Sequence, residues 1–296
     1  MVCFCTIPYI IGMIIIIKYI FKLLNFIFKH FLLPSNDLKA KYGDGYALIT
    51  GGSGGIGLSF AKELLKMKFK LCLLSSNKKN LEKAKKELLD LYPNSTIKII
   101  EFDLSQLYTE ETIKNLEEKI SSELNGEEIS ILFNNAGVLY RGRFDTIQIS
   151  NISSMINVNI FGLTILTKIV IEYMKKRTKK SLLFASGSFD GQLRFANRVV
   201  YGATKSYVEA FYEGLARDIQ DKIDFTVIEI GPVKTNMNKD DLPFTNSSDE
   251  FAKECIKFVG RYKFIKGSKK HAILGWLMSN PLIKYIGRKI DLKENK

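Results

Sequence analysis

Short apolar runs alternate with helical patterns from Tyr46 onward. Six of the runs are expected to be strands, at Tyr46–Thr50, Lys70–Ser75, Thr96–Leu104, Ile129–Asn134, Ser181–Ala185 and Asp224–Ile230. The helical patterns between them lie near 56–67, 79–91, 110–124, 150–175 and 202–220. This order predicts one doubly wound α/β domain, in which helices cover both faces of a parallel sheet and the crossovers are right-handed.

The pattern changes after Gly231, where a polar loop at 234–247 precedes Ser247-Ser248-Asp249-Glu250. This spacing is that of a capping box and predicts another helix. A substrate lid is expected within the same segment. The chain is therefore divided into an N-terminal membrane segment (1–42), the α/β domain (43–260) and a basic, apolar C-terminal extension (261–296).

The N-terminus begins with an uncharged apolar run from Val2 to Ile17. A helix needs about 20 apolar residues to cross a bilayer, so a crossing would include Lys18, which can snorkel to an interface. Lys18, Lys22 and Lys29 share one helical face, which predicts an interfacial second half. Because the positive charge follows the apolar run, the body is expected on the cytoplasmic side.

A cleaved signal peptide and a hydrophobic packing arm are the alternatives to this anchor. A signal peptide begins with positive charge and ends in a small-residue cleavage site, and neither feature is present. Acylation of Cys3 and Cys5 is also open, although unmodified thiols are the simpler interpretation. The uncleaved anchor is the favoured prediction.

Composition and charge describe a packed, basic protein. With 46% apolar residues, 25% charged residues and 6 prolines, disordered, collagen-like and low-complexity chains are excluded. The net charge of +13 comes from the two ends of the chain, because the basic and acidic residues of 43–252 are equal in number. A negatively charged membrane surface explains both ends, whereas no nucleic-acid reading module is present. The four cysteines show no paired short spacings in the body of the chain, which argues against a disulfide scaffold or a zinc module, and no metal site is expected.

A glycine cluster, Thr50-Gly51-Gly52-Ser53-Gly54-Gly55-Ile56-Gly57, joins the first predicted strand to a helix. Glycine lets backbone amides approach a pyrophosphate, and the helix N-terminus offers free N–H groups and partial positive charge. This placement is typical of a Rossmann-type dinucleotide site. A flexible glycine turn is the alternative.

The end of the second predicted strand favours NADP(H) as the cofactor. Sites that prefer NAD usually have an acidic residue there for the ribose 2′-hydroxyl. This chain instead has Ser75, Ser76 and Lys78, followed by a second lysine. Hydroxyls and cations suit an additional phosphate, although a solvated lysine pair would give the same sequence.

Several motifs follow the glycine cluster in a specific order. Asn134-Asn135-Ala136-Gly137 ends a strand, and Asn159, Ser188, Tyr201 and Lys205 come after it. With this order the chain resembles the short-chain dehydrogenase/reductase superfamily over roughly residues 44–260. The resemblance implies an oxidoreductase that acts on a hydroxyl or carbonyl group with a nicotinamide cofactor.

The catalytic roles can be argued from chemistry. A phenol with a pKa near 10 is a poor acid–base catalyst at neutral pH, and a nearby ammonium lowers that pKa; Lys205 is therefore expected to tune Tyr201. Tyr201 would protonate a developing alkoxide while Ser188 donates a hydrogen bond to the same oxygen. The resemblance adds a proton-relay role for Asn159. Asn157 and Ser186 are the neighbouring alternatives, although spacing prefers Asn159 and Ser188.

The resemblance also implies contacts to the two ends of the cofactor. Asp103 and Leu104 would lie at the adenine, with a strand-end cap as the alternative for Asp103. The usual Pro-Gly turn appears as Ile230-Gly231-Pro232-Val233-Lys234-Thr235, with Ile230 in place of the first proline. The expected cofactor-binding residues are Thr50, Gly51, Ser53, Gly55, Ile56, Gly57, Ser75, Ser76, Lys78, Asp103, Leu104, Asn135, Ala136, Gly137, Tyr201, Lys205, Pro232, Val233 and Thr235.

Three features resemble the microsomal very-long-chain 3-oxoacyl-CoA reductases and the related steroid 17-beta dehydrogenases: the anchor, the second strand, and the tail Ser248–Gly260 with His271–Trp276. This resemblance implies reduction of a lipid 3-oxoacyl-CoA at the endoplasmic reticulum membrane, and a homodimer formed through helices 150–175 and 202–220. Reduction of 3-ketosphinganine, of a steroid or of a retinoid, and a silent membrane scaffold, are the alternatives. Ser76 stands where these reductases often have arginine, and the C-terminus lacks a dilysine signal.

Overall fold

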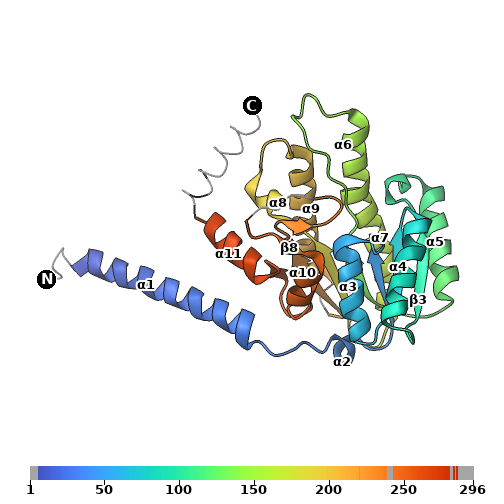
Figure 1. Cartoon of the computed structure of the whole chain (residues 1–296), viewed down its shortest axis with the longest axis horizontal. Coiled ribbons are helices and arrows are strands. Elements are labelled where there is room, and N and C mark those ends of the chain that lie inside the picture. The colour runs from blue at the N-terminus through green and yellow to red at the C-terminus, as the bar shows by residue number, and fades with distance from the viewer. Residues whose placement is uncertain (1–5, 220, 239–242, 281–282, 284, 286–296) are drawn as a thin grey trace. The chain divides into compact units, whose positions relative to one another are not determined.

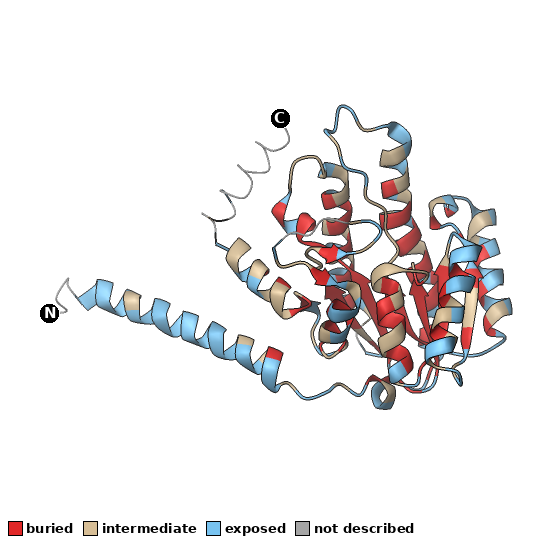
Figure 2. Cartoon of the chain, viewed as in Figure 1, coloured by how far each residue is buried: buried red, intermediate tan, exposed pale blue. Residues whose placement is uncertain are grey.

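The computed structural model describes all residues except 1–5, 220, 239–242, 281–282, 284 and 286–296. The chain divides into two units, one ending at Ser35 and the other beginning at Asn36. In the first unit, α1 (Thr6–Ile27) continues into a π-helical turn, η1 (Phe28–Leu32). The combined helix has 27 residues and contains an 18-residue window with a mean hydropathy of 2.1, and α1 buries none of its side chains (Figure 2). At 1.5 Å per residue it is about 40 Å long, which is enough to cross a bilayer.

The second unit is built on a parallel sheet of seven strands in the order β3-β2-β1-β4-β5-β6-β9 (Figure 1). This order confirms the predicted doubly wound α/β fold. The strands are β1 (Tyr46–Thr50), β2 (Lys70–Ser75), β3 (Ile97–Glu101), β4 (Ile129–Asn134), β5 (Ser181–Ser186), β6 (Ile223–Ile228) and β9 (Phe264–Ile265). A separate two-stranded sheet pairs β7 (Val233–Lys234) with β8 (Asn246–Ser247).

Helices pack on both faces of the sheet. The longer ones are α3 (Gly55–Lys66), α4 (Lys78–Leu91), α5 (Glu110–Leu124), α6 (Ile149–Ile156), α7 (Leu163–Lys175), α9 (Val199–Asp218), α10 (Ser248–Cys255) and α11 (Lys269–Met278). Short elements are α2 (Leu38–Tyr42), η2 (Leu104–Gln106), η3 (Asn157–Gly162) and α8 (Phe189–Leu193). The predicted helix 150–175 is continuous but contains the π-helical turn η3. Its apolar length also suits a membrane span, but it is largely buried in the body.

The centre of the sheet is fully buried because helices cover it on both sides. Every residue of β1, β4 and β5 is buried (Figure 2). On one face Phe60, Phe133 and Phe184 form an aromatic cluster, in which the last two rings stack with centroids 4.1 Å apart. This rigid centre positions the loops at the carboxyl ends of the strands.

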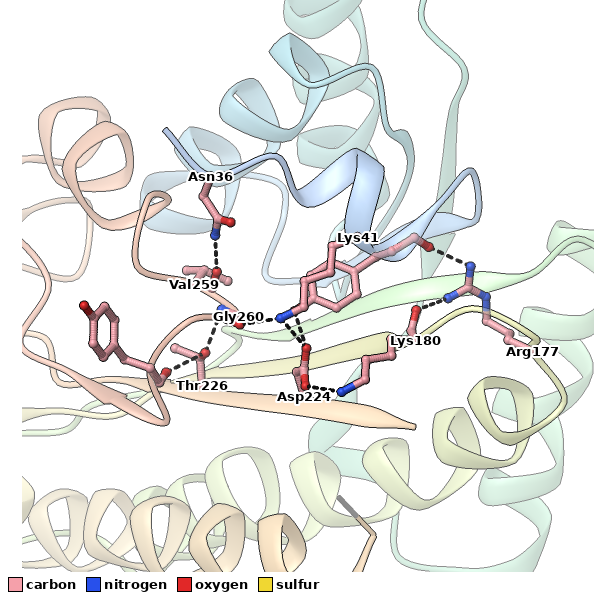
Figure 3. A network of polar contacts seen from close by, with 10 residues as sticks. Asn36, Lys41, Arg177, Lys180, Asp224, Thr226, Val259 and Gly260 are labelled. Atoms are coloured by element: carbon pink, nitrogen blue, oxygen red, sulfur yellow. Dashed lines mark hydrogen bonds and ion pairs between the residues drawn. The ribbon is translucent and has the colours of Figure 1, made fainter. Parts of the chain in front are cut away.

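Residues 36–42 belong to the body, whereas the sequence pattern placed them in the membrane segment. Tyr42 is fully buried and its hydroxyl donates to Asp224 Oδ2 at 2.8 Å, which also pairs with Lys41 at 2.6 Å (Figure 3). Arg177 donates to the carbonyl oxygen of Tyr42 at 2.7 Å. The second compact unit therefore begins at Asn36.

The C-terminal extension, predicted to begin at residue 261, likewise starts inside the fold. β9 pairs with β6 through Val227 and Ile228 and completes the sheet. A two-residue strand is too short to show a periodic pattern, so it could not be predicted in this way.

Candidate active site

The glycine cluster forms a tight cradle between β1 and α3. Gly51 and Gly55 have φ values of +63° and +52°, in the left-handed region that favours glycine. A Cβ at Gly57 would collide with the carbonyl oxygen of Gly51. No side chain caps the N-terminus of α3 at Gly54. The first amides of this helix can therefore bind an anion, and the cradle fits a dinucleotide pyrophosphate.

Thr50 ties this cradle to the loop after β4. Its Oγ1 accepts hydrogen bonds from the backbone amides of Asn135 and Ala136, both at 2.9 Å. In return, Asn135 Nδ2 donates to the carbonyl oxygen of Thr50 at 3.1 Å. β1 and β4 are the neighbours at which the strand order reverses, and ligands bind at such a switch point in doubly wound folds.

Tyr201 and Lys205 lie one turn apart on α9, as predicted. The Lys205 ammonium is 5.6 Å from the centre of the Tyr201 ring and donates to the carbonyl oxygen of Ser186 at 2.7 Å. Burial lowers the pKa of Lys205 to about 8.

The pKa of Tyr201 does not follow the prediction. Burial, and then the charge of Asp190, raise it above its usual value, while a hydrogen bond with Ser188 opposes the shift. Lys205 is not among the groups that shift this pKa, so the lowering expected from Lys205 is not seen in this structure. Burial has the largest effect, because it disfavours the charged phenolate.

The structure separates the two candidate serines. Ser188 is buried, accepts from the amide of Asp190 at 3.2 Å, and bonds to Tyr201. Ser186 instead donates to Asn135 Oδ1 at 3.1 Å. Of the two serines, Ser188 is thus the one whose side chain interacts with the phenol of Tyr201, in agreement with its spacing in the sequence.

Asn159 lies in the π-helical turn η3. Turns of this kind are frequently found at functional sites. The Oδ1 of Asn159 accepts from the amide of Val138 at 2.8 Å, and its Nδ2 donates to the Val138 carbonyl oxygen and to Thr204 Oγ1. A Cβ at Gly137 would lie 3.3 Å from Asn159 Oδ1 and 3.6 Å from Lys205 Nζ. Asn159 thus holds the loop after β4 beside Lys205.

A cavity of about 690 Å³ joins these parts. Among the predicted site residues, its lining includes Gly51, Ser53, Gly55, Ile56, Asn135, Ala136, Gly137, Ser188, Tyr201, Lys205, Pro232, Val233 and Thr235. The wall beyond Tyr201 is largely apolar and includes Leu139, Phe189, Leu193, Phe195, Leu274 and Met278. The cavity therefore offers a polar end at the cradle and an apolar chamber beside the phenol.

The residues predicted at the adenine end lie outside this cavity. Ser75 accepts from Ser53 Oγ at 3.0 Å, while Ser76 is exposed. Asp103 caps η2 by accepting from the amide of Ser105 at 2.9 Å, which is the alternative role considered for it. Leu104 is buried. Adenine contacts by these residues stay a prediction.

One carboxylate near this end was missed. Glu101, at the end of β3, accepts from the backbone amide of Lys78 at 3.3 Å. The sequence rule considers the end of β2 alone, so only the pairing of β2 with β3 brings this acid close.

Two further cavity residues were also missed. Arg198 pairs with the buried carboxylate of Asp190 at 3.1 and 3.2 Å, and thereby links α8 to the start of α9. These residues match no motif, and the ion pair depends on the turn between the two helices. In the sequence, the one indication of this ion pair is that an acid, Asp190, lies two residues after Ser188 and a base, Arg198, three residues before Tyr201.

The comparison with known protein families gives one clear match. A family model described as short chain dehydrogenase matches residues 45–245. A very-long-chain 3-oxoacyl-CoA reductase of Macaca fascicularis is 33% identical over 85% of this chain and 80% of its own length. A putative steroid dehydrogenase 1 of Caenorhabditis elegans is 31% identical over 89% of this chain and 84% of its own length.

Solved structures share the fold at lower identity. A 7beta-hydroxysteroid dehydrogenase superposes with a TM-score of 0.71 at 19% identity, covering 84% of this chain and 99% of its own. A short-chain dehydrogenase from Sphingobium yanoikuyae in complex with NADPH has a TM-score of 0.66 at 23% identity and covers 75% and 86% of the two chains. At these identities the likeness establishes the fold alone.

Proposed function

This chain belongs to the short-chain dehydrogenase family and is an oxidoreductase, and we propose that it is a membrane-anchored, NADPH-dependent reductase of a lipid 3-oxoacyl-CoA. The observation that carries the proposal is the cavity in which the glycine cradle, the Ser188–Tyr201–Lys205 group and an apolar chamber meet. A nicotinamide cofactor, when bound, supplies the hydride for reduction of a carbonyl.

The chain's own residues supply the proton and the orientation. Ser188 donates a hydrogen bond to the carbonyl oxygen, and Tyr201 gives its proton to that oxygen as negative charge develops there. The phenol of Tyr201 is protonated at neutral pH, as the proton donor in the reductive direction must be. Lys205, with a pKa of about 8, is mostly protonated there and holds positive charge close to the phenol.

The preference for NADPH is supported by the hydroxyls of Ser75 and Ser76 and the cation of Lys78 at the end of β2. Glu101, the acid opposite the end of β2, bonds to the backbone amide of Lys78. Titration of the protein with NADPH and with NADH, followed by their fluorescence, tests the preference. Equal affinity for the two would contradict it.

Lipid substrates are supported by two features. Leu139, Phe195 and Met278 contribute to an apolar chamber beside the phenol, and the exposed apolar helix Thr6–Leu32 is long enough to cross a bilayer. The names of the relatives favour a 3-oxoacyl-CoA first and a steroid second. We infer residence in the endoplasmic reticulum membrane, with the body facing the cytoplasm.

A homodimer is part of the proposal. Family members commonly pair through two long helices, which correspond here to α6–α7 and α9. The mass of the protein in mild detergent tests this, and a particle containing one protomer would exclude it.

The decisive experiment measures NADPH oxidation by the detergent-solubilised protein. A long-chain 3-oxoacyl-CoA, a 17-ketosteroid and 3-ketosphinganine are offered in parallel, with Tyr201→Phe as the control. We expect turnover of the CoA ester and a loss of at least about a thousandfold in the variant, because the proton donor is gone. Turnover of the steroid or of ketosphinganine alone would reassign the substrate. Activity that survives Tyr201→Phe would refute the mechanism, and silence with every carbonyl would favour the scaffold alternative.

A further inference from the structure

The loop after β6 closes one side of the cavity through Gly231, Pro232 and Val233. In the proposed function this loop lies against the nicotinamide. The residue before it is Ile230. An isoleucine restricts the backbone less than a proline does, so contacts with other elements contribute to fixing the loop.

His271 on α11 makes that connection. Its side chain is fully buried. Its ring forms hydrogen bonds with the backbone of two consecutive residues, Gly231 and Pro232. Nδ1 accepts from the amide of Gly231 at 3.3 Å, and Nε2 lies 3.0 Å from the carbonyl oxygen of Pro232. Because Nδ1 is the acceptor, Nε2 carries the proton and donates. Burial lowers the pKa of His271 to about 4, so the neutral ring that this arrangement needs is the form present at neutral pH.

The ring also lies close to Gly231. A Cβ at Gly231 would lie 2.9 Å from Cδ2 of His271, so glycine is needed for the close approach. The carbonyl oxygen of Pro232 receives a second hydrogen bond from the amide of Asn246 at 3.1 Å. The loop is therefore held by donors from both α11 and β8.

His271 is itself fixed by its surroundings. Its amide donates to Ser268 Oγ at 3.2 Å, and that hydroxyl donates to Asn246 Oδ1 at 2.9 Å. The rings of Phe251 and Phe189 lie 5.1 and 5.9 Å from the imidazole. The backbone of His271 is thus held by Ser268, and its imidazole packs between two aromatic rings.

The same helix reaches the substrate end of the cavity. Leu274 and Met278, three and seven residues after His271, line the apolar chamber. All of α11 lies beyond the segment 45–245 that matches the family. We propose that His271 is a positioning residue that fixes the Gly231–Val233 loop for the cofactor, so that α11 completes the active site. This inference rests on the proposed cofactor site.

The test uses the full-length protein in detergent and no carbonyl substrate. His271→Phe keeps a ring but removes both nitrogens, which leaves the Gly231 amide without its acceptor. Without cofactor, we expect hydrogen–deuterium exchange of the segment 229–236 to become about tenfold faster. The Kd for NADPH should rise by about tenfold as well. Trp276→Ala, on the same helix but half-exposed, is the matched control and should change neither value.

A second variant separates positioning from folding. His271→Ala leaves a ring-sized space, and millimolar imidazole should restore both the slow exchange and the affinity. The proposal is overturned if folded His271→Phe exchanges and binds as the wild type does, or if imidazole restores neither property. A wild-type protein that binds neither NADPH nor NADH would instead refute the proposed cofactor, and the exchange measurement would still test the contact between His271 and the loop.

Discussion

The ion pair between Arg198 and Asp190 allows a quantitative test of the site. The pair joins the helix that follows Ser188 to the start of the helix that carries Tyr201. The Asp190 side chain is 10% exposed and that of Arg198 is 28% exposed. Arg198→Met therefore leaves a carboxylate buried without its cation, whereas Asp190→Asn leaves a guanidinium that can still reach water.

The expected energies follow from this asymmetry. Two unit charges about 4 Å apart attract by about 4 kcal/mol at an effective dielectric constant near 20. Water at the partly exposed Arg198 reduces this value, so we expect a coupling of about 2 kcal/mol. Arg198→Met should cost roughly 2–3 kcal/mol of unfolding free energy and Asp190→Asn about 1 kcal/mol.

Urea unfolding of the wild type, the two single variants and the double variant measures this coupling as a double-mutant cycle. The pH dependence of alcohol oxidation with NADP⁺ gives an independent readout, because Tyr201 must then lose its proton. Asp190 raises the pKa of Tyr201 and Arg198 lowers it, so Asp190→Asn should move the profile to lower pH and Arg198→Met to higher pH. A coupling below about 0.5 kcal/mol, or shifts in the same direction, would refute the argument.

Two substitutions distant from this pair test the cradle and the attachment of α2. Gly57→Ala places a methyl group against the carbonyl oxygen of Gly51. We expect it to lower the unfolding free energy by about 1–3 kcal/mol and to abolish measurable NADPH binding in a fluorescence titration. Wild-type affinity in this variant would contradict the close packing. Tyr42→Phe removes the hydrogen bond to Asp224. We expect it to lower the unfolding free energy by about 1 kcal/mol with no change in NADPH affinity. A weaker affinity would contradict the separation of this contact from the site.

Long, regular elements were predictable from the sequence because many residues share one period. The helix expected at 110–124 occurs at those residues, and β1, β2 and β4 begin and end as predicted. The third strand was expected to reach Leu104 but ends at Glu101. Its last apolar residues form a turn and η2 instead, because Asp103 caps that helix through its side chain.

The sequence allowed prediction of those site residues that belong to recognisable motifs. The glycine cluster, Ser188, Tyr201 and Lys205 could be found because their order along the chain is specific, and the structure brings them to one cavity. Asp190 and His271 could not be found in this way. Their roles depend on partners 8 and 39–40 residues away, and such contacts exist only once the helices have packed.

The contacts of residues 36–42 lie far from the cavity. Asn36 donates to the carbonyl oxygen of Val259 at 2.6 Å, and Lys41 donates to that of Gly260 at 2.8 Å (Figure 3). These contacts, with Asp224 at the second residue of β6, lie at the amino ends of the parallel strands. The cradle and Ser188 follow the carboxyl ends of β1 and β5. The length of the strands therefore separates the α2 contacts from the cradle, so a change at α2 should alter stability and leave cofactor affinity unchanged.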